Sequence, residues 1–478
     1  MKGKGVCSFF DRFFAERLKG FFMGPVYPVI VAFMMLCGYY SGLELYFHFV
    51  NMTLVAIALC VCDSLRPLII VISTFVFQIS REHTPSTNNI SGIASDYFFT
   101  EWRGVALIIS FVVVFVALCV FFIKNRLITV KRLTSLPFLI PSAILATAFL
   151  LNGAFSDSWE IDSLGFAAVQ CVMWFVIFYV LLLGFSKEKG EQLVDYLVYV
   201  SSVIVILLVV QLLEIYLFSG ELILPDGSFN RYAIVYGWGV TNTAAQSLTV
   251  TIPIMALGAV RGRGRLYYLI MMGVVFFASV FNLSRTALLV GLPLYVACII
   301  IVYRRSLDRK RCMHEIMGIV GAVVLLLLVF NKWLFPAIGN YLTRGVDDSG
   351  RFNIWKNSLI AFREQWLSGK GFFGLSKHLG GWSNTSFIPY MAHNTPVHIL
   401  GCCGIIGFIA YVYYRVRTAI PFFKKRNTTK TLLGLSLLSV LLGSLLENFV
   451  FYILPMLYYS AVFAVSCRLI EEENDQKQ

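Results

Sequence analysis

Three arginines and a histidine stand where apolar segments of the chain meet polar ones. Arg231 shortly precedes one apolar run, Arg285 opens another, and Arg351 lies in a long polar segment. A guanidinium group stays charged at physiological pH and can bind phosphate oxygens through paired hydrogen bonds. Three such groups at one depth could hold a diphosphate and stabilise the charge that grows on it as it leaves. The alternative is that each arginine merely extends its charge from an apolar surface to the membrane interface.

The histidine, His393, begins the sequence HNTPVHIL at the start of a further apolar run. Pro396 falls where the first turn of a helix tolerates proline. The positive end of the helix dipole favours neutral imidazole, which can accept a proton as a general base. A polar helix cap is the alternative interpretation. His398 lies five residues later, on another face, and ranks lower.

Four further polar residues are weaker candidates. Asn394 and Asn242 could contact a ligand, although a role as helix caps is favoured for both. Glu447 and Asn448 lie between the last two apolar runs, where polar groups are costly and often functional. We treat these two as secondary candidates, with a possible role for Glu447 as a counter-ion of the arginines.

The sequence offers no recognisable metal or cofactor motif. The polar segments lack an Asp-x-Asp pair, and the cysteine spacings match no zinc pattern. The glycine-rich stretch GKGFFG, residues 369–374, lacks the Lys-Ser/Thr ending of a phosphate loop and is interpreted as a turn. We therefore expect neither a metal nor a cofactor.

The composition indicates that these residues are positioned by a helical bundle embedded in a membrane. The 478 residues are 58% hydrophobic and only 14% charged, whereas soluble chains carry about 25% charged residues. Apolar runs of about 20 residues predict helices and not a barrel. We predict an all-α polytopic transmembrane bundle of about 14 spans, with a range of about 12 to 14. The predicted spans are 24–42, 44–62, 66–80, 104–123, 134–153, 164–185, 196–218, 243–260, 266–283, 285–303, 316–335, 393–414, 431–447 and 449–467.

Positive charge is distributed unevenly between the connecting segments. With the N-terminus in the cytoplasm, 28 of the 39 lysines and arginines fall on the cytoplasmic side, as membrane proteins prefer. Both termini are then cytoplasmic. Seven of the 11 remaining cations fall in or beside residues 336–396. Positive charge that stays on the outer side indicates an anionic partner at the outer leaflet.

These features divide the chain into four parts. Residues 1–23 are predicted as a cytoplasmic amphipathic N-terminus, 24–230 as an N-terminal transmembrane bundle, 231–467 as a transmembrane core, and 468–478 as a cytoplasmic tail. The core contains one long extracytoplasmic loop, residues 336–392. A connection of that length between two spans indicates a functional segment.

Four stretches of the core carry a resemblance to a known family. They are RYAIVYGWGVTNTAAQSLTVTIP, SRTALLVGLPLY, SGRFNIWKNSLIAFREQWLSGKGFFG and HNTPVHILGCCGIIGFIAYV, in this order. Together they cover about residues 231–412 and resemble the O-antigen ligase and polymerase superfamily, membrane enzymes that handle undecaprenyl-diphosphate-linked glycans. The N-terminal half is similar to the family only in its hydropathy.

The resemblance implies roles for individual residues. By motif, the family's functional loop arginine falls on Arg351, its histidine on His393, and the arginine of its SR-x-x-L span on Arg285. A further arginine falls on Arg231, where this sequence departs from the usual Gly/Asn/Pro-rich spacing. The resemblance implies a GT-C-like fold and a metal-independent, inverting glycosyl transfer. The arginines would hold the donor diphosphate, and His393 would activate or orient the acceptor hydroxyl.

Three functions remain open on the sequence. The favoured one is a polymerase of O-antigen, capsule or exopolysaccharide in the bacterial cytoplasmic (inner) membrane, with its site on the outer face. The second is a ligase that moves the glycan to a lipid-core or other acceptor, and the third is a non-catalytic flippase or transporter. Expected partners are the undecaprenyl-diphosphate-linked oligosaccharide, a glycan or lipid acceptor, membrane lipids, and a chain-length regulator or flippase of the same pathway. Nucleic acid is not expected.

Overall fold

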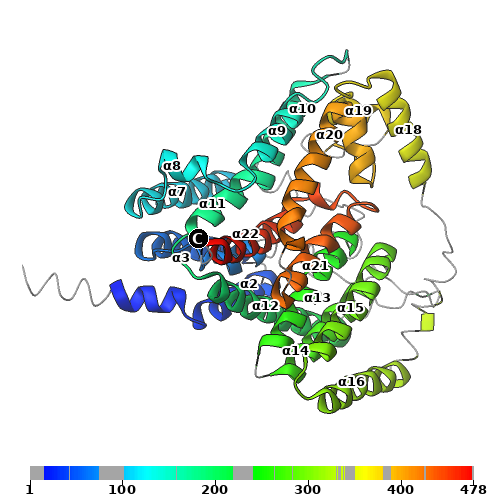
Figure 1. Cartoon of the computed structure of the whole chain (residues 1–478). Helices are drawn as coiled ribbons and strands as arrows, with labels where there is room; N and C mark the ends of the chain where they lie inside the picture. The colour runs from blue at the N-terminus through cyan, green and yellow to red at the C-terminus, as the bar shows by residue number, and fades with distance from the viewer. Residues whose placement is uncertain are drawn as a thin grey trace, which may run out of the picture.

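The computed structural model describes residues 15–41, 43–74, 102–157, 159–218, 225, 241–262, 264–281, 284–329, 331, 335–336, 339, 350–380, 389–424 and 427–475. These residues form helices and connecting turns, without a β-strand in the described part, so the all-α prediction is confirmed there. Figure 1 shows the helices gathered into one bundle, with α18 (Arg351–Glu364), α19 (Phe372–His378) and the start of α20 (Thr395–Phe423) at one end.

Four helical segments of the described chain are long and apolar enough to cross a membrane. They are Ile161–Gly184, Gly190–Ile215, Arg285–Arg305 and Thr395–Phe423. A fifth results if Ala15–Met23 and Val26–Ser41, which meet at 68°, count as one bent span. The chain is thus an integral membrane protein, and the count of fourteen spans remains a prediction.

The first of these segments is built from α10 (Ile161–Cys171), a π-helical turn (Val172–Val176) and α11 (Ile177–Gly184). The remaining helices are α2 (Val26–Ser41), α3 (Glu44–Val61), α4 (Leu68–Thr74), α7 (Trp102–Lys124), α8 (Val130–Thr134), α9 (Leu139–Leu150), α12 (Gly190–Phe218), α13 (Thr241–Arg261), α14 (Arg265–Phe281), α15 (Arg285–Arg305), α16 (Arg309–Val329), α18 (Arg351–Glu364), α19 (Phe372–His378), α20 (Thr395–Phe423), α21 (Thr428–Gly443), the 3₁₀ turn η3 (Phe449–Phe451) and α22 (Ile453–Asp475).

The span predicted at residues 134–153 is not one helix. Phe138 adopts the left-handed conformation, with φ of 61°, and separates α8 from α9. Pro137 precedes it and has no backbone N–H to continue a helix. The 12 residues of α9 measure about 18 Å at 1.5 Å per residue, whereas a bilayer core is about 30 Å thick.

Helix α20 is broken at Gly404, and the segment from Trp366 to Gly371 fills the break. At Gly404 the backbone has φ of 65° and ψ of −163°. The carbonyls of Gly401 and Cys402 accept hydrogen bonds from the backbone N–H groups of Lys370 and Gly371, each at 2.9 Å. Beyond the break, the N–H groups of residues 405 and 406 donate to the carbonyls of residues 366 and 367. The break is tolerated because the neighbouring backbone satisfies the exposed polar groups, as discontinuous membrane helices require.

The glycine-rich stretch, residues 369–374, therefore packs against the broken helix in addition to forming a turn. It joins α18 to α19. Gly369 and Gly371 have φ of 70° and 81°, and a Cβ on Gly369 would overlap the backbone of Cys402. The N–H of Phe372 donates to Asn152 Oδ1 at 3.0 Å, which ties the same stretch to the turn after α9. The described part of the loop from Trp366 to Phe372 is thus packed on the bundle.

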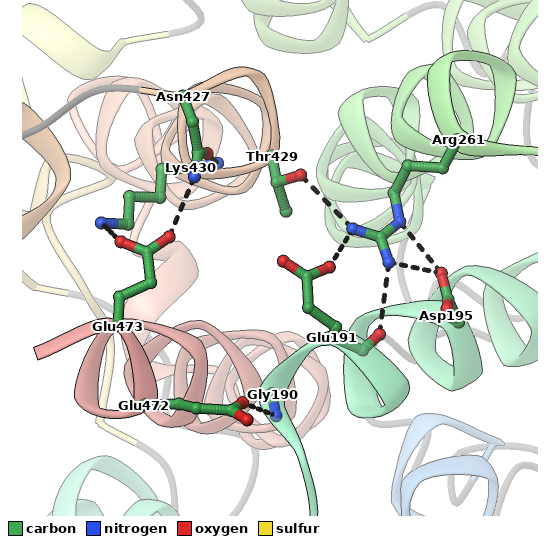
Figure 2. A network of polar contacts seen from close by, with 9 residues as sticks. All are labelled: Gly190, Glu191, Asp195, Arg261, Asn427, Thr429, Lys430, Glu472 and Glu473. Carbon is green, nitrogen blue, oxygen red and sulfur yellow. Dashed lines mark hydrogen bonds and ion pairs between the residues drawn. The ribbon is translucent and has the colours of Figure 1, made fainter. Parts of the chain in front are cut away.

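A polar network joins four helices at the end of the bundle opposite to α18. Arg261, at the end of α13, pairs with Glu191 and Asp195 in the first turns of α12, with 2.8 Å to the Asp195 carboxylate (Figure 2). Lys430 at the start of α21 pairs with Glu473 near the end of α22. Helices α13, α21 and α22 run from this network to the end of the bundle that carries the candidate site, so they hold that end in register.

Candidate functional site

Glu447 lies between the two residues that the sequence placed at the ends of the long loop. One carboxylate oxygen pairs with the Arg351 guanidinium, and the other lies 2.7 Å from His393 Nδ1. The Glu447 side chain is only 5% exposed, against 25% for Arg351 and 31% for His393. The Glu447 carboxylate is thus nearly buried, whereas both of its partners, Arg351 and His393, are partly exposed.

Backbone contacts fix this cluster to the ends of α18, α20 and α21. Arg351 is the first residue of α18 and also donates to the Leu446 carbonyl at 2.9 Å. The Thr395 N–H donates to the Ser444 carbonyl at 2.8 Å, which joins the start of α20 to the end of α21. A guanidinium with two fixed contacts loses little further freedom when it binds an anion.

His393 precedes α20 and is not its first residue. The helix begins at Thr395, and Asn394 is its N-cap. The backbone of His393 is left-handed, with φ of 52°, a conformation that non-glycine residues rarely adopt outside functional or strained positions. In this conformation the imidazole meets the Glu447 carboxylate.

The Asn394 amide is used within the protein. Its Oδ1 accepts from the Val397 N–H at 3.0 Å, and its Nδ2 donates to the Leu445 carbonyl at 2.8 Å. The predicted helix cap is therefore present, and a contact between Asn394 and a ligand stays a prediction. His398 is fully buried between the rings of Phe372 and Phe451, away from the surface of the cluster.

Two aromatic residues that the sequence did not single out support the histidine. Trp355, one turn into α18, donates from Nε1 to the Ala392 carbonyl at 2.8 Å, immediately before His393. The Tyr390 ring lies 6.2 Å from the His393 ring, and the Tyr390 N–H donates to Ser376 Oγ at 2.8 Å. Burial raises the pKa of Tyr390, so its phenol stays protonated at neutral pH. Only their nearness to Arg351 and His393 in the sequence could have pointed to them.

Arg285 belongs to the same end of the bundle. It is the first residue of α15, after the N-cap Ser284, whose hydroxyl accepts from the Ala287 N–H at 3.4 Å. Helix α15 packs against α13 and α21, and α21 ends at Gly443 beside the cluster. The Arg285 side chain is half-buried.

Two of the predicted positions are not fully described. Arg231 lies outside the described residues. Asn242 lies in the first turn of α13, but its side chain is outside the described part. Their roles stay predictions, as does that of Asn448, which follows Glu447 and is fully buried.

Other cations of the loop have carboxylate partners. Lys370 pairs with Glu364 at 2.5 Å, and Lys377 pairs with Glu160 across the tip of α10. The Lys370 ammonium holds the pKa of Glu364 below its ordinary value. These two lysines, like Arg351, therefore have part of their charge balanced by a carboxylate within the protein.

The described residues contain no group of three or more His, Cys, Asp or Glu side chains that could hold a metal ion. The chemistry that the described cluster offers is a cation, a carboxylate and an imidazole. His393 Nε2 makes no hydrogen bond to any described residue and belongs to a ring that is partly exposed.

Comparison with known proteins covers the part of the chain that holds most of the cluster. Residues 268–412 match the family model described as O-antigen ligase. The match includes Arg285, Arg351 and His393 and ends before Glu447. No curated protein sequence matches the chain significantly. The chain thus carries a segment, residues 268–412, that matches the O-antigen ligase family, and this match supports the predicted resemblance to the O-antigen ligase/polymerase superfamily.

Proposed function

We propose that this protein transfers a glycan from an undecaprenyl-diphosphate-linked donor at the outer face of the cytoplasmic membrane and thereby extends a cell-surface polysaccharide. The observation that carries the proposal is the contact of one carboxylate, Glu447, with both Arg351 and His393. This contact supports the proposal because a glycosyl transfer from a diphosphate donor needs a group that binds the diphosphate and a proton acceptor near it, the roles we assign to Arg351 and His393.

Glu447 gives His393 the orientation of a general base. If the neutral imidazole carries its proton on Nδ1, that N–H donates to the Glu447 carboxylate, and Nε2 can accept a proton. A buried carboxylate orients the histidine of hydrolase triads in the same way. Because Arg351 already balances the charge of Glu447, the carboxylate does not require a protonated His393 as its counter-ion.

The proposed step is a single displacement. The acceptor hydroxyl oxygen attacks the anomeric carbon of the donor sugar as its proton passes to His393 Nε2. The bond from that carbon to the diphosphate oxygen breaks, and the electron pair stays on the diphosphate. Arg351 and Arg285, with Arg231, stabilise the charge that develops there. Attack from the face opposite to the leaving group inverts the anomeric configuration, and no metal is required.

A ligase that transfers the glycan to a lipid-core or other acceptor is the second candidate. The description of the matching family model favours it, and the same cluster could serve it without change. A flippase or transporter is a weaker candidate, because Arg351, His393 and Glu447 contact one another at the ends of helices, where they suit interfacial chemistry.

The decisive experiment incubates the purified full chain with a lipid-diphosphate-linked repeat unit alone. Longer lipid-linked chains would support the polymerase. Reaction only after addition of a separate acceptor would support the ligase. Absence of any transfer by a well-folded protein, with and without acceptor, would remove the glycosyltransferase proposal. The His393→Ala variant is the control for adventitious hydrolysis of the donor.

A further inference from the structure

Three neutral polar side chains at or next to the turn of residues 443–448 are buried and have no hydrogen-bond partner in the described structure. They are Gln246 of α13, Ser444 at the end of α21, and Asn448. Both amide atoms of Gln246 and of Asn448 are unpaired, as is the Ser444 hydroxyl oxygen. Gln246 is 3% exposed, and the other two are fully buried. Buried side-chain amides in native proteins nearly always have a partner, so this group calls for an explanation.

Gly443 brings the three residues into one place. Its carbonyl accepts from the N–H groups of Leu446 and Glu447, at 3.0 and 2.9 Å, so residues 443–447 form a turn that contains Ser444 and ends at Glu447. A Cβ on residue 443 would come 2.9 Å from Gln246 Oε1, so the Gln246 amide lies against this same turn. The unpaired amide of α13 thus lies at the turn that presents Glu447 to His393.

The chemistry of this polar cluster differs from that of the charged cluster. Two carboxamides and a hydroxyl carry no charge, and they supply both donors and acceptors. They therefore suit a neutral ligand that also has both, such as a sugar hydroxyl or acetamido group. A diphosphate accepts but does not donate, and Arg351 suits it better.

We propose that Gln246, Ser444 and Asn448 form a subsite for an uncharged hydroxyl or acetamido group of the sugar that reacts at His393. This inference rests on the proposed function, because it assigns the reacting sugar to residues that lie at the turn before Glu447 or directly follow it. The subsite would select the sugar, whereas the charged cluster binds the leaving group.

The test uses the full chain in lipid nanodiscs and two probes that bind without reaction. Saturation-transfer NMR measures binding of benzyl glucoside, benzyl N-acetylglucosaminide and benzyl glucuronide. Phosphorus NMR line broadening measures binding of inorganic pyrophosphate. The variants are Gln246→Met and Asn448→Leu, which keep a side chain of similar length and shape and remove the amide.

We expect each variant to weaken binding of at least one neutral glycoside about tenfold, the loss that follows from one or two missing hydrogen bonds. Pyrophosphate binding should not change. The melting temperature should stay the same or rise, because an apolar side chain no longer buries an unpaired amide. Ser436→Ala is the matched control: its hydroxyl already donates to the Val250 carbonyl between the same two helices at 2.6 Å, so glycoside binding should survive.

Three results would overturn the inference. They are a wild-type protein that binds none of the glycosides, a Gln246→Met variant that binds them as wild type does, and a Gln246→Met variant whose melting temperature falls. The last would mean that the amide serves the fold. Failure of the proposed function would give another result. Arg351→Ala would then bind pyrophosphate as the wild type does, while Gln246→Met would still bind the glycoside more weakly.

Discussion

His393 Nδ1 lies 2.7 Å from a carboxylate oxygen of Glu447, a residue 54 positions further along the chain. The second oxygen of the same carboxylate pairs with Arg351. This arrangement couples two groups that the sequence treats as separate ends of one loop. Loss of the carboxylate should therefore disturb both proton transfer and diphosphate binding.

The first prediction concerns Glu447→Gln. The amide cannot balance Arg351 and can present its NH₂ group to His393 Nδ1, which favours the wrong tautomer. We expect turnover to fall at least about 100-fold, since loss of the triad carboxylate costs up to about 10,000-fold in a hydrolase. Glycan transfer by purified protein measures this effect. Glu364→Gln, which removes another loop carboxylate paired with a cation, should keep turnover near wild type. Equal activity of the Glu447 and Glu364 variants would contradict the proposed role of Glu447.

The second prediction concerns Arg285. Its replacement by alanine should abolish product while membrane insertion and protein level stay normal, because the helix cap Ser284 and the packing of α15 remain. Arg285→Lys should recover part of the activity, since lysine keeps the charge but not the two-pronged hydrogen bonding. Product can be measured as polymer on the cell surface. Full activity of the alanine variant would exclude Arg285 from the site.

The third prediction concerns the break in α20. In Gly404→Ala, the methyl group would overlap the Leu367 carbonyl, and the backbone has a φ of 65° that favours glycine. We expect a destabilisation of about 2–4 kcal/mol and loss of activity, because the loop that carries α18 is displaced. Thermal unfolding in detergent measures the first effect. Gly318→Ala in α16, where a Cβ would meet nothing within 4 Å, is the control and should not lower stability. A Gly404→Ala variant as stable as wild type would mean that the loop does not require this approach.

The fourth prediction concerns metal ions. The proposed mechanism stabilises the leaving diphosphate with guanidinium groups alone. Treatment of the purified protein with a chelator should therefore leave glycan transfer unchanged. The rate before and after chelation, and after addition of Mg²⁺ or Mn²⁺, is the measurement. A loss of turnover that either metal restores would overturn the metal-independent mechanism.

The fifth prediction concerns the side of the membrane on which α18 lies. Asn357, on the exposed face of α18, should be outside, and Leu307, fully exposed between α15 and α16, should be cytoplasmic. A cysteine at 357 should react with a membrane-impermeant maleimide on intact cells, whereas one at 307 should react only after permeabilisation. The unchanged protein reports the background from its own cysteines. The reverse pattern would invert the predicted topology.

The sequence by itself determined the class of the protein and two members of the cluster. Apolar runs of sufficient length dictate membrane helices, because hydrocarbon leaves a backbone no partner except its own helix. Arg351 could be found through the stretch that carries the family resemblance, and His393, like Arg285 of α15, because it stands at an abrupt change from polar to apolar sequence.

Tertiary structure alone decided how these residues meet. Glu447 is 96 positions from Arg351, and no local pattern indicates that its carboxylate reaches both Arg351 and His393. Likewise, the break in α20 could not be predicted locally, because a distant segment, residues 366–371, supplies the hydrogen bonds that the helix lacks around Gly404. In the sequence, Gln246 is one of several polar residues of a mostly apolar helix, and only the structure shows that its amide lies next to Gly443. The physical reason is common to all three: a buried polar group is stabilised by its neighbours in space, and the chain brings those neighbours from far along its length.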